Sequence, residues 1–243
     1  MRSVVFGGHS PIALATCAAL AQTGQYVTLV TRSADAELRE AALSAGVNDL
    51  LEGDLAVPGV GERLLTGTDR GPLGALVFTH RYRGEANDSR QHEVEVRAPA
   101  RLIEAAAQHK GSEPLAVVLT VSPAARLIVS DQPFAYHAAK AAQVQLVRHA
   151  AATLGAQGVR VNGVSPSAFV FKERARAHYE AHPELLARIN RMVPLGRMAS
   201  VDDIANVVAF LTTPASAYIS GQIIEVDGGL STLDIGTWAR DIG

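Results

Sequence analysis

Short apolar segments alternate with helix-forming segments along the whole chain, and this alternation constrains the fold more than any other feature. Strand-like segments separated by helical ones predict parallel strands joined by crossover helices. No linker or internal repeat interrupts the pattern. We therefore predict an α/β fold, in which residues 1–243 form a single doubly wound domain around a seven-stranded parallel sheet. The predicted strands are residues 3–6, 26–30, 49–55, 76–79, 117–122, 159–164 and 222–226.

The composition is that of an ordinary soluble globular protein, with 48% hydrophobic and 19% charged residues. A formal net charge of −2 provides no electrostatic footprint for nucleic acid or for an anionic membrane. Cys17 is the only cysteine, so an internal disulfide and a cysteine-built metal site are excluded, and we expect Cys17 to be buried. The sequence has no apolar stretch of about 18 residues and begins without signal-peptide features, so we expect a cytoplasmic location.

Residues 117–142 bring together three side chains that suit the chemistry of a carbonyl group. Tyr136 and Lys140 are four positions apart, so they share one face of a helix. The unperturbed pKa of a tyrosine is about 10. A neighbouring ammonium lowers such a pKa because it favours the phenolate, and a tyrosine beside a lysine is therefore a usable proton donor near neutral pH. Ser122 falls where the central strand ends, at the edge where open α/β sheets bind ligands. The alternative interpretation of the Tyr–Lys pair is a solvated helix face.

This stretch resembles the active site of the short-chain dehydrogenase/reductase family, which carries Ser, Tyr and Lys in this order near this spacing. Small residues flank the pair, as expected of a helix packed beside a cofactor (Ala138, Ala139, Ala141 and Ala142). The resemblance covers essentially the whole chain and is also specific at residues 196–229, which include SVDDIANVVAFLTTPASAYISGQIIEVDGG. It implies an oxidoreductase that reduces a carbonyl or oxidises a secondary alcohol, with Ser122, Tyr136 and Lys140 as catalytic residues.

The chain opens with a strand, a glycine turn and a helix over residues 12–23, the order that points free backbone N–H groups at a phosphate. Gly7 and Gly8 match the family's TGxxxGxG turn, whereas Pro11 and Ala13 stand where its later glycines would be. A Rossmann-type NAD site places an acid at the end of the second strand, and here Arg32 follows Thr31 instead. Because arginine suits a 2′-phosphate, we predict NADP(H) rather than NAD(H), with a surface arginine as the alternative.

The resemblance implies further cofactor contacts along the same edge of the sheet. Asp54, at the end of the third strand, would lie near the adenine, although an aspartate is also a common turn residue. No metal ligand is predicted. The complete set of predicted cofactor-binding residues is Gly7, Gly8, Ser10, Ile12, Thr31, Arg32, Ser33, Asp54, Leu55, Thr79, Tyr136, Lys140, Pro166, Ser167 and Phe169.

The chain departs from the family near the expected nicotinamide. The family continues the fourth strand with Asn-Asn-Ala-Gly, but residues 78–81 read FTHR, and Ser167 replaces the glycine of a Pro-Gly pair. Glu95 stands where similar sequences carry a helix asparagine that completes a catalytic tetrad through a water near the lysine. A carboxylate at Glu95 could hold that water, but its negative charge would also work against the effect of the Lys140 ammonium on the tyrosine.

Polar residues 80–93 are predicted to form an exposed loop before a long helix over residues 93–110. His80, Arg81 and Arg83 could recognise an acidic substrate, but the preferred interpretation is a solvated loop. The resemblance implies a substrate lid over about residues 167–195, which would exclude water from the reaction. Ser200 with Asp203 predicts a helix N-terminus, and Val208, Phe210 and Leu211 its apolar face.

The resemblance also implies a homodimer or homotetramer that acts on a small molecule. The alanine-rich faces around Val144 and Leu146 are compatible with subunit contacts, or with burial against their own sheet. The C-terminal tail, residues 231–243 with Trp238, extends past the usual core and could cover a neighbouring subunit.

Three functional hypotheses follow from the sequence. The first is an NADP(H)-dependent oxidoreductase of the ketoreductase type. The second is a catalytically silent protein that binds a dinucleotide or partner subunits, which the departures at Pro11, residues 78–81, Glu95 and Ser167 favour. The third is a redox-neutral or dehydratase-like enzyme. The substrate itself cannot be deduced, because one fold hosts many activities.

Overall fold

A computed structural model describes residues 1–65, 71–85, 87–110, 112–234 and 236. Within these residues the strands form one parallel sheet of seven, in the order β3-β2-β1-β4-β5-β6-β7. The predicted doubly wound parallel sheet is therefore confirmed. The chain winds outward from β1 in both directions, which leaves a crevice at the carboxyl ends of β1 and β4. The strands are β1 Arg2–Phe6, β2 Tyr26–Thr31, β3 Asp49–Glu52, β4 Leu73–Phe78, β5 Leu115–Thr120, β6 Val159–Pro166 and β7 Ile223–Val226.

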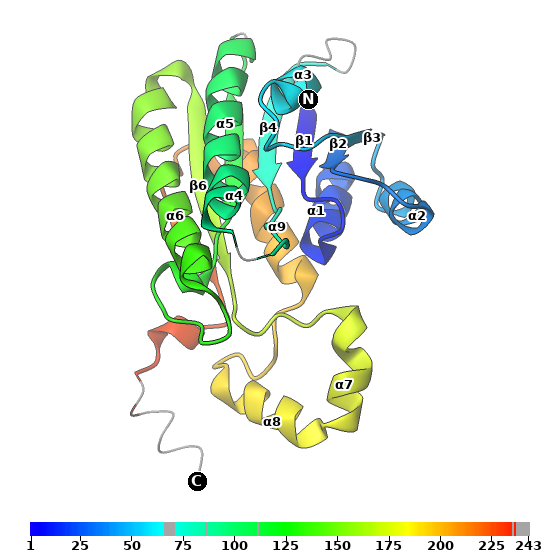
Figure 1. Ribbon diagram of the computed structural model, residues 1–243, viewed down its shortest axis with the longest axis vertical. Coiled ribbons are helices and arrows are strands. Elements are labelled where there is room, and N and C mark those ends of the chain that lie inside the picture. The colour runs from blue at the N-terminus through cyan, green and yellow to red at the C-terminus, as the bar shows by residue number, and fades with distance from the viewer. Residues whose placement is uncertain (66–70, 86, 111, 235, 237–243) are drawn as a thin grey trace.

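Helices cover both faces of the sheet (Figure 1). Helices α3, α5 and α6 pack on one face, and α1, α2 and α9 on the other. The central strand β5 contacts both layers, since Val117 and Leu119 belong to one core cluster and Val118 to the other. The described helices are α1 Pro11–Gln22, α2 Ala36–Ser44, α3 Val60–Leu65, α4 Asp88–His92, α5 Ala98–His109, α6 Phe134–Leu154, α7 Arg176–Ala181, α8 Pro183–Met192 and α9 Val201–Thr212.

The predicted third strand is too long at its C-terminal end. Strand β3 ends at Glu52, because the Gly53 N–H donates to the Thr31 carbonyl and the chain then turns. Asp54 makes that turn by accepting a hydrogen bond from the Ala56 N–H at 2.9 Å. Asp54 therefore lies in a turn, which agrees with the alternative interpretation of this aspartate as a turn residue.

The prediction of an exposed loop over residues 80–93 is wrong in its second half. Helix α4 begins at Asp88, where the Asn87 side chain accepts a hydrogen bond from the Arg90 N–H. Helix α4 continues into a π-helical turn, Glu93–Arg97, and then into α5. Such a turn holds one residue more than an α-turn and often occurs at functional sites. Here it contains Glu95, whose side chain is fully buried.

The segment that contains α7 and α8 forms an arch beyond the carboxyl edge of the sheet, where the substrate lid was predicted (Figure 1). Its two ends are joined by backbone hydrogen bonds, from the Phe171 N–H to the Ala199 carbonyl at 2.7 Å and from the Ala199 N–H to the Phe169 carbonyl at 3.1 Å. These bonds fix where the arch leaves and rejoins the body of the molecule.

Helix α9 begins with the predicted capping box, in which Ser200 and Asp203 each accept a hydrogen bond from the other's backbone N–H. Val208 and Leu211 are fully buried as predicted, whereas Phe210 is 40% exposed. Cys17 is buried, also as predicted. Most of the C-terminal tail, including Trp238, lies outside the described residues. No helix in the described part of the chain has the length and apolarity needed to cross a membrane.

Candidate active site

Two adjoining hollows lie along the carboxyl edge of the sheet, and together they receive most of the predicted site residues. The first is lined by the glycine turn, Thr31, Arg32, Asp54 and Leu55. The second is lined by Ser122, Tyr136, Lys140, Ile12 and the Pro166–Ser167 pair. The two hollows form one continuous cleft, because five residues line both of them: Ser10, Thr79, His80, Arg81 and Arg83. Ser33 and Phe169 are outside both sets of lining residues.

The second hollow brings Ser122, Tyr136 and Lys140 together, as the sequence predicted. Ser122 follows β5 and caps a short turn, where its Oγ accepts a hydrogen bond from the Ala124 N–H at 3.2 Å. Tyr136 and Lys140 lie in the first turns of α6 and are only 9% and 3% exposed. The Lys140 Nζ is 5.5 Å from the centroid of the Tyr136 ring. The three side chains are thus placed around one space.

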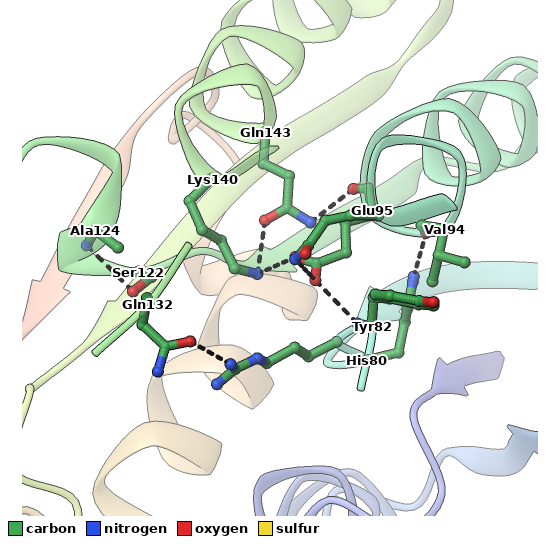
Figure 2. A network of polar contacts seen from close by, with 11 residues as sticks. His80, Tyr82, Val94, Glu95, Ser122, Ala124, Gln132, Lys140 and Gln143 are labelled. Carbon is green, nitrogen blue, oxygen red and sulfur yellow. Dashed lines mark hydrogen bonds and ion pairs between the residues drawn. The ribbon is translucent and has the colours of Figure 1, made fainter. Parts of the chain in front are cut away.

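Lys140 forms a buried ion pair with Glu95 (Figure 2). Its Nζ is 2.8 Å from Glu95 Oε2, and it donates a hydrogen bond to Gln143 Oε1 at 3.0 Å. Gln143 in turn donates to the backbone carbonyl of Glu95 at 2.7 Å. The sequence suggested a carboxylate that holds a water near the lysine, but the contact is direct and Gln143 completes it. Sequence analysis missed Gln143, although its place three positions after Lys140 puts both on one face of α6.

The other oxygen of the Glu95 carboxylate is also fully engaged (Figure 2). Oε1 accepts hydrogen bonds from the Tyr82 backbone N–H at 2.9 Å and from Gln91 Nε2 at 2.8 Å. A buried charge persists only when it is paired and hydrogen-bonded, and Glu95 meets both conditions. Glu95 therefore connects α6 to the chain that leaves β4, on the wall of the second hollow.

His80 packs against the body of the molecule, so the prediction of a solvated loop is wrong for this residue. Its Nε2 lies 2.8 Å from the Val94 carbonyl, and its ring meets the Phe78 ring edge to face at 5.9 Å. Burial lowers the pKa of His80, and the bond to Val94 and the charge of Glu95 offset this only in part. The ring is thus neutral near pH 7 and donates its Nε2–H to the carbonyl, which can only accept.

Arg81 is exposed but extends over the second hollow. Its guanidinium carbon is 4.4 Å from the centroid of the Tyr136 ring, within the range of a cation–π contact. Its Nη2 donates a hydrogen bond to Gln132 Oε1, in the loop that precedes α6. Arg81 therefore bridges the cleft from the end of β4 to the start of α6, which the preferred interpretation of a solvated loop did not anticipate.

The glycine turn is required by close packing. Gly7 has a φ of +135°, and a Cβ there would lie 2.5 Å from Thr79 Oγ1 and 2.8 Å from the His80 backbone nitrogen. A Cβ on Gly8 would lie 2.6 Å from the Cβ of Thr31. Ser10 follows as the N-cap of α1, and its side chain makes no capping hydrogen bond. The turn thus leaves the Ser10 side chain and the amides that follow Pro11, which itself has no N–H, at the cleft, an arrangement that fits a dinucleotide phosphate.

Four arginines line the first hollow: Arg32, Arg81, Arg83 and Arg90. Arg90, from α4, pairs with Asp54 at 2.7 Å. Arg32 is exposed at the end of β2, and it has no ion pair within the described parts of the chain. Arg32 therefore offers a positive charge, with no acidic partner among the described residues, where a ribose of the cofactor is predicted. The described residues contain no group of His, Cys, Asp and Glu side chains that could hold a metal ion.

Comparison with protein families gives a match over more than half of the chain. The family model described as enoyl-(acyl carrier protein) reductase matches residues 83–231. Among curated proteins, isoepoxydon dehydrogenase patN of Penicillium expansum is 32% identical over 139 residues, 56% of this chain and 54% of that protein. The 7alpha-hydroxysteroid dehydrogenase of Escherichia coli is 34% identical over 113 residues, 46% of this chain and 43% of that protein.

A third relative is named as inactive. It is the inactive 2-(S)-hydroxypropyl-CoM dehydrogenase 2 of Xanthobacter autotrophicus, 39% identical over 101 residues, 41% of this chain and 44% of that protein. The chain thus spans about half the length of each of these curated relatives.

Solved structures share the fold over nearly the whole chain. A short-chain dehydrogenase/reductase from Serratia marcescens has a TM-score of 0.79 at 26% identity and covers 95% of this chain and 97% of its own. A gluconate 5-dehydrogenase from Burkholderia cenocepacia, solved in complex with NADP and tartrate, has a TM-score of 0.78 at 21% identity and covers 96% of both chains. The similarity to the second structure concerns the fold alone.

Proposed function

The chain belongs to the short-chain dehydrogenase/reductase family, and we propose that it is an NADP(H)-dependent oxidoreductase that reduces a carbonyl or oxidises a secondary alcohol. One observation carries this proposal. Ser122, Tyr136 and Lys140 line one hollow, and that hollow continues into the hollow of the glycine turn and Arg32. The proposed proton donor and the proposed dinucleotide phosphate site would therefore lie within one cleft, which carbonyl reduction requires.

Each of the three side chains has a separate role in the proposed reaction. A reduced nicotinamide, when bound, supplies the hydride. The Tyr136 hydroxyl gives its proton to the carbonyl oxygen, which gains negative charge as the carbonyl is reduced. The Ser122 Oγ donates a hydrogen bond to the same oxygen and orients it. Lys140, on the same face of α6, stabilises the phenolate that Tyr136 becomes.

Arg32 supports the choice of NADP(H) within this proposal. It is exposed at the first hollow and has no acidic partner among the described residues. Its guanidinium can therefore donate two parallel hydrogen bonds to the oxygens of a 2′-phosphate. No acid stands at the end of β2, where Thr31 and Arg32 take the place of the residue that would accept the ribose hydroxyls of NAD(H). The residues proposed to hold the dinucleotide are Gly7, Gly8, Ser10, Arg32, Thr79 and Lys140.

A second candidate function is a catalytically silent protein that binds a dinucleotide. The observation in its favour is the engagement of Lys140 by Glu95 and Gln143, which directs its ammonium toward the wall of the hollow. The inactive relative of Xanthobacter autotrophicus is consistent with this candidate. The silent protein would bind NADPH without turning over any carbonyl.

Titration with NADPH and NADH, followed by assays of NADPH oxidation with ketones and aldehydes, separates the two candidates. We expect Arg32→Ala to weaken NADPH binding by about 10- to 100-fold, because a hydrogen bond to a charged group contributes about 1.5–3 kcal/mol. Binding of NADH should not change. Arg39→Ala, at an exposed arginine of α2 that pairs with Glu52, is the matched control. Equal loss of NADPH and NADH binding in Arg32→Ala would contradict the assignment of Arg32 to the 2′-phosphate.

A further inference from the structure

We propose that the substrate is a small oxo acid and that Arg81 binds its carboxylate beside the carbonyl that reacts. This inference rests on the proposed function of the same hollow, whose chemistry it restricts to one class of substrate. The carboxylate would be attached to the carbonyl carbon or separated from it by one carbon, as in 2-oxo and 3-oxo acids.

The position of Arg81 sets the distance between the two groups of the substrate. Its guanidinium lies 4.4 Å from the ring centroid of Tyr136, the residue proposed to protonate the carbonyl oxygen. An anion bound to this guanidinium is therefore held close to the Tyr136 hydroxyl. Only a short spacer between carboxylate and carbonyl allows both contacts at once.

Arg81 has donors available for such an anion. Among the described residues, Arg81 donates a hydrogen bond to the neutral side chain of Gln132 and contacts the Tyr136 ring, and it forms no ion pair. A guanidinium has five N–H donors in a planar fork that matches a carboxylate. Gln132 occupies one nitrogen, and it also holds the side chain across the cleft.

Among the described residues next to Tyr136, Arg81 is a cation that an anion can reach. Lys140 is paired with Glu95, and the two side chains are 4% and 0% exposed. His80 is neutral because burial lowers its pKa. Asp131 also lines this hollow, and the described structure has no ion pair between Asp131 and Arg81. Lys172 and Arg83 also line this hollow.

Arg81 also lines the first hollow, so the phosphates of the dinucleotide are a second anion within its reach. The two roles have different consequences. An oxo-acid site discriminates between an acid and its neutral amide, whereas a cofactor contact changes the affinity for NADPH alone. A measurement of both affinities in the same variants decides between them.

Calorimetric titration tests the proposal without requiring turnover. We would titrate 2-oxobutanoate and 3-oxobutanoate, and the amide of each, into the protein with and without saturating NADPH. The wild-type protein should bind one of the acids at least tenfold more tightly than its amide. Arg81→Gln should lower the affinity for that acid to the level of the amide, and Arg81→Lys should retain part of the preference, because lysine keeps the charge but loses the fork.

Arg148→Gln is the matched control, since Arg148 is an exposed arginine with a neutral glutamine partner, at 3.5 Å, and lies outside the cleft lining. Its acid preference should equal that of the wild-type protein. Equal affinity for acid and amide, no measurable binding of either, or an unchanged preference in Arg81→Gln would overturn the proposal. Weaker NADPH binding in Arg81→Gln with unchanged acid binding would also overturn it. Acid binding that depends on Arg81, in a protein that oxidises no NADPH, would instead refute the proposed function and leave the acid site standing.

Discussion

Glu95 and Lys140 meet inside the wall of the cleft, where both side chains are almost completely shielded from solvent. Taking two charges out of water is unfavourable, and their attraction offsets this only if the remaining polar atoms are bonded. Tyr82, Gln91 and Gln143 supply those bonds. At the scale of single residues, this network determines where the Lys140 ammonium points.

Replacement of Glu95 by Gln is expected to destabilise the protein strongly. The Lys140 ammonium would stay buried without a counter-ion, and breaking a buried pair in this way costs about 3–5 kcal/mol. Urea denaturation followed by circular dichroism should show a lower midpoint. Glu173→Gln breaks an exposed pair with Arg176 and should leave the midpoint unchanged. Equal midpoints for wild type and Glu95→Gln would contradict the ion pair.

The helix elements differ in how much of their structure the sequence determines. The α9 N-terminus was predicted correctly, because a capping box is local and needs only Ser200 and Asp203 three positions apart. The π-helical turn Glu93–Arg97 was not predicted, because nothing in its own sequence specifies an extra residue in the turn. The packing of Glu95 against α6, which is distant in the sequence, accompanies that turn.

The α9 capping box is expected to make stability depend on pH. Bonds from Arg197 hold the pKa of the Asp203 carboxyl well below its usual range, and bonds from Ser200 act in the same direction. The folded state therefore binds fewer protons than the unfolded chain, and the carboxylate contributes stability above the unfolded value of about 3.9. This contribution is lost as the pH falls from there toward the folded pKa.

Asp203→Asn tests this contribution. The variant should be less stable than the wild-type protein at pH 7, and the difference between their urea midpoints should shrink below about pH 4. Asp202→Asn, at the neighbouring acid of the same first turn, is the control. A difference that stays constant from pH 7 to pH 3 would exclude the carboxylate as its cause.

For the molecule as a whole, the sequence predicted the sheet and the edge on which the cleft lies. Short apolar runs such as residues 115–120 are typical of strands whose two faces are both buried, and this strand contributes to both core clusters. The alternation of such runs with helical segments was therefore enough to predict a parallel sheet. The positions of Ser122, Tyr136 and Lys140 could be predicted, because the end of a strand and the face of a helix are both evident from the local sequence. Arg81 was not, since its place above Tyr136 depends on a hydrogen bond to Gln132, 51 positions away. The single domain over residues 1–243, the homo-oligomer and the cytoplasmic location stay predictions.

NADPH oxidation by Tyr136→Phe, compared with the wild-type protein on the same carbonyl substrate, is the most direct test of the proposed function. The variant keeps the aromatic ring that contacts Arg81 but loses the hydroxyl proton. We expect kcat to fall by about 10²- to 10⁴-fold, the usual contribution of general acid catalysis, while NADPH affinity measured by titration stays the same. Full turnover in Tyr136→Phe would contradict the assignment of Tyr136 as the proton donor.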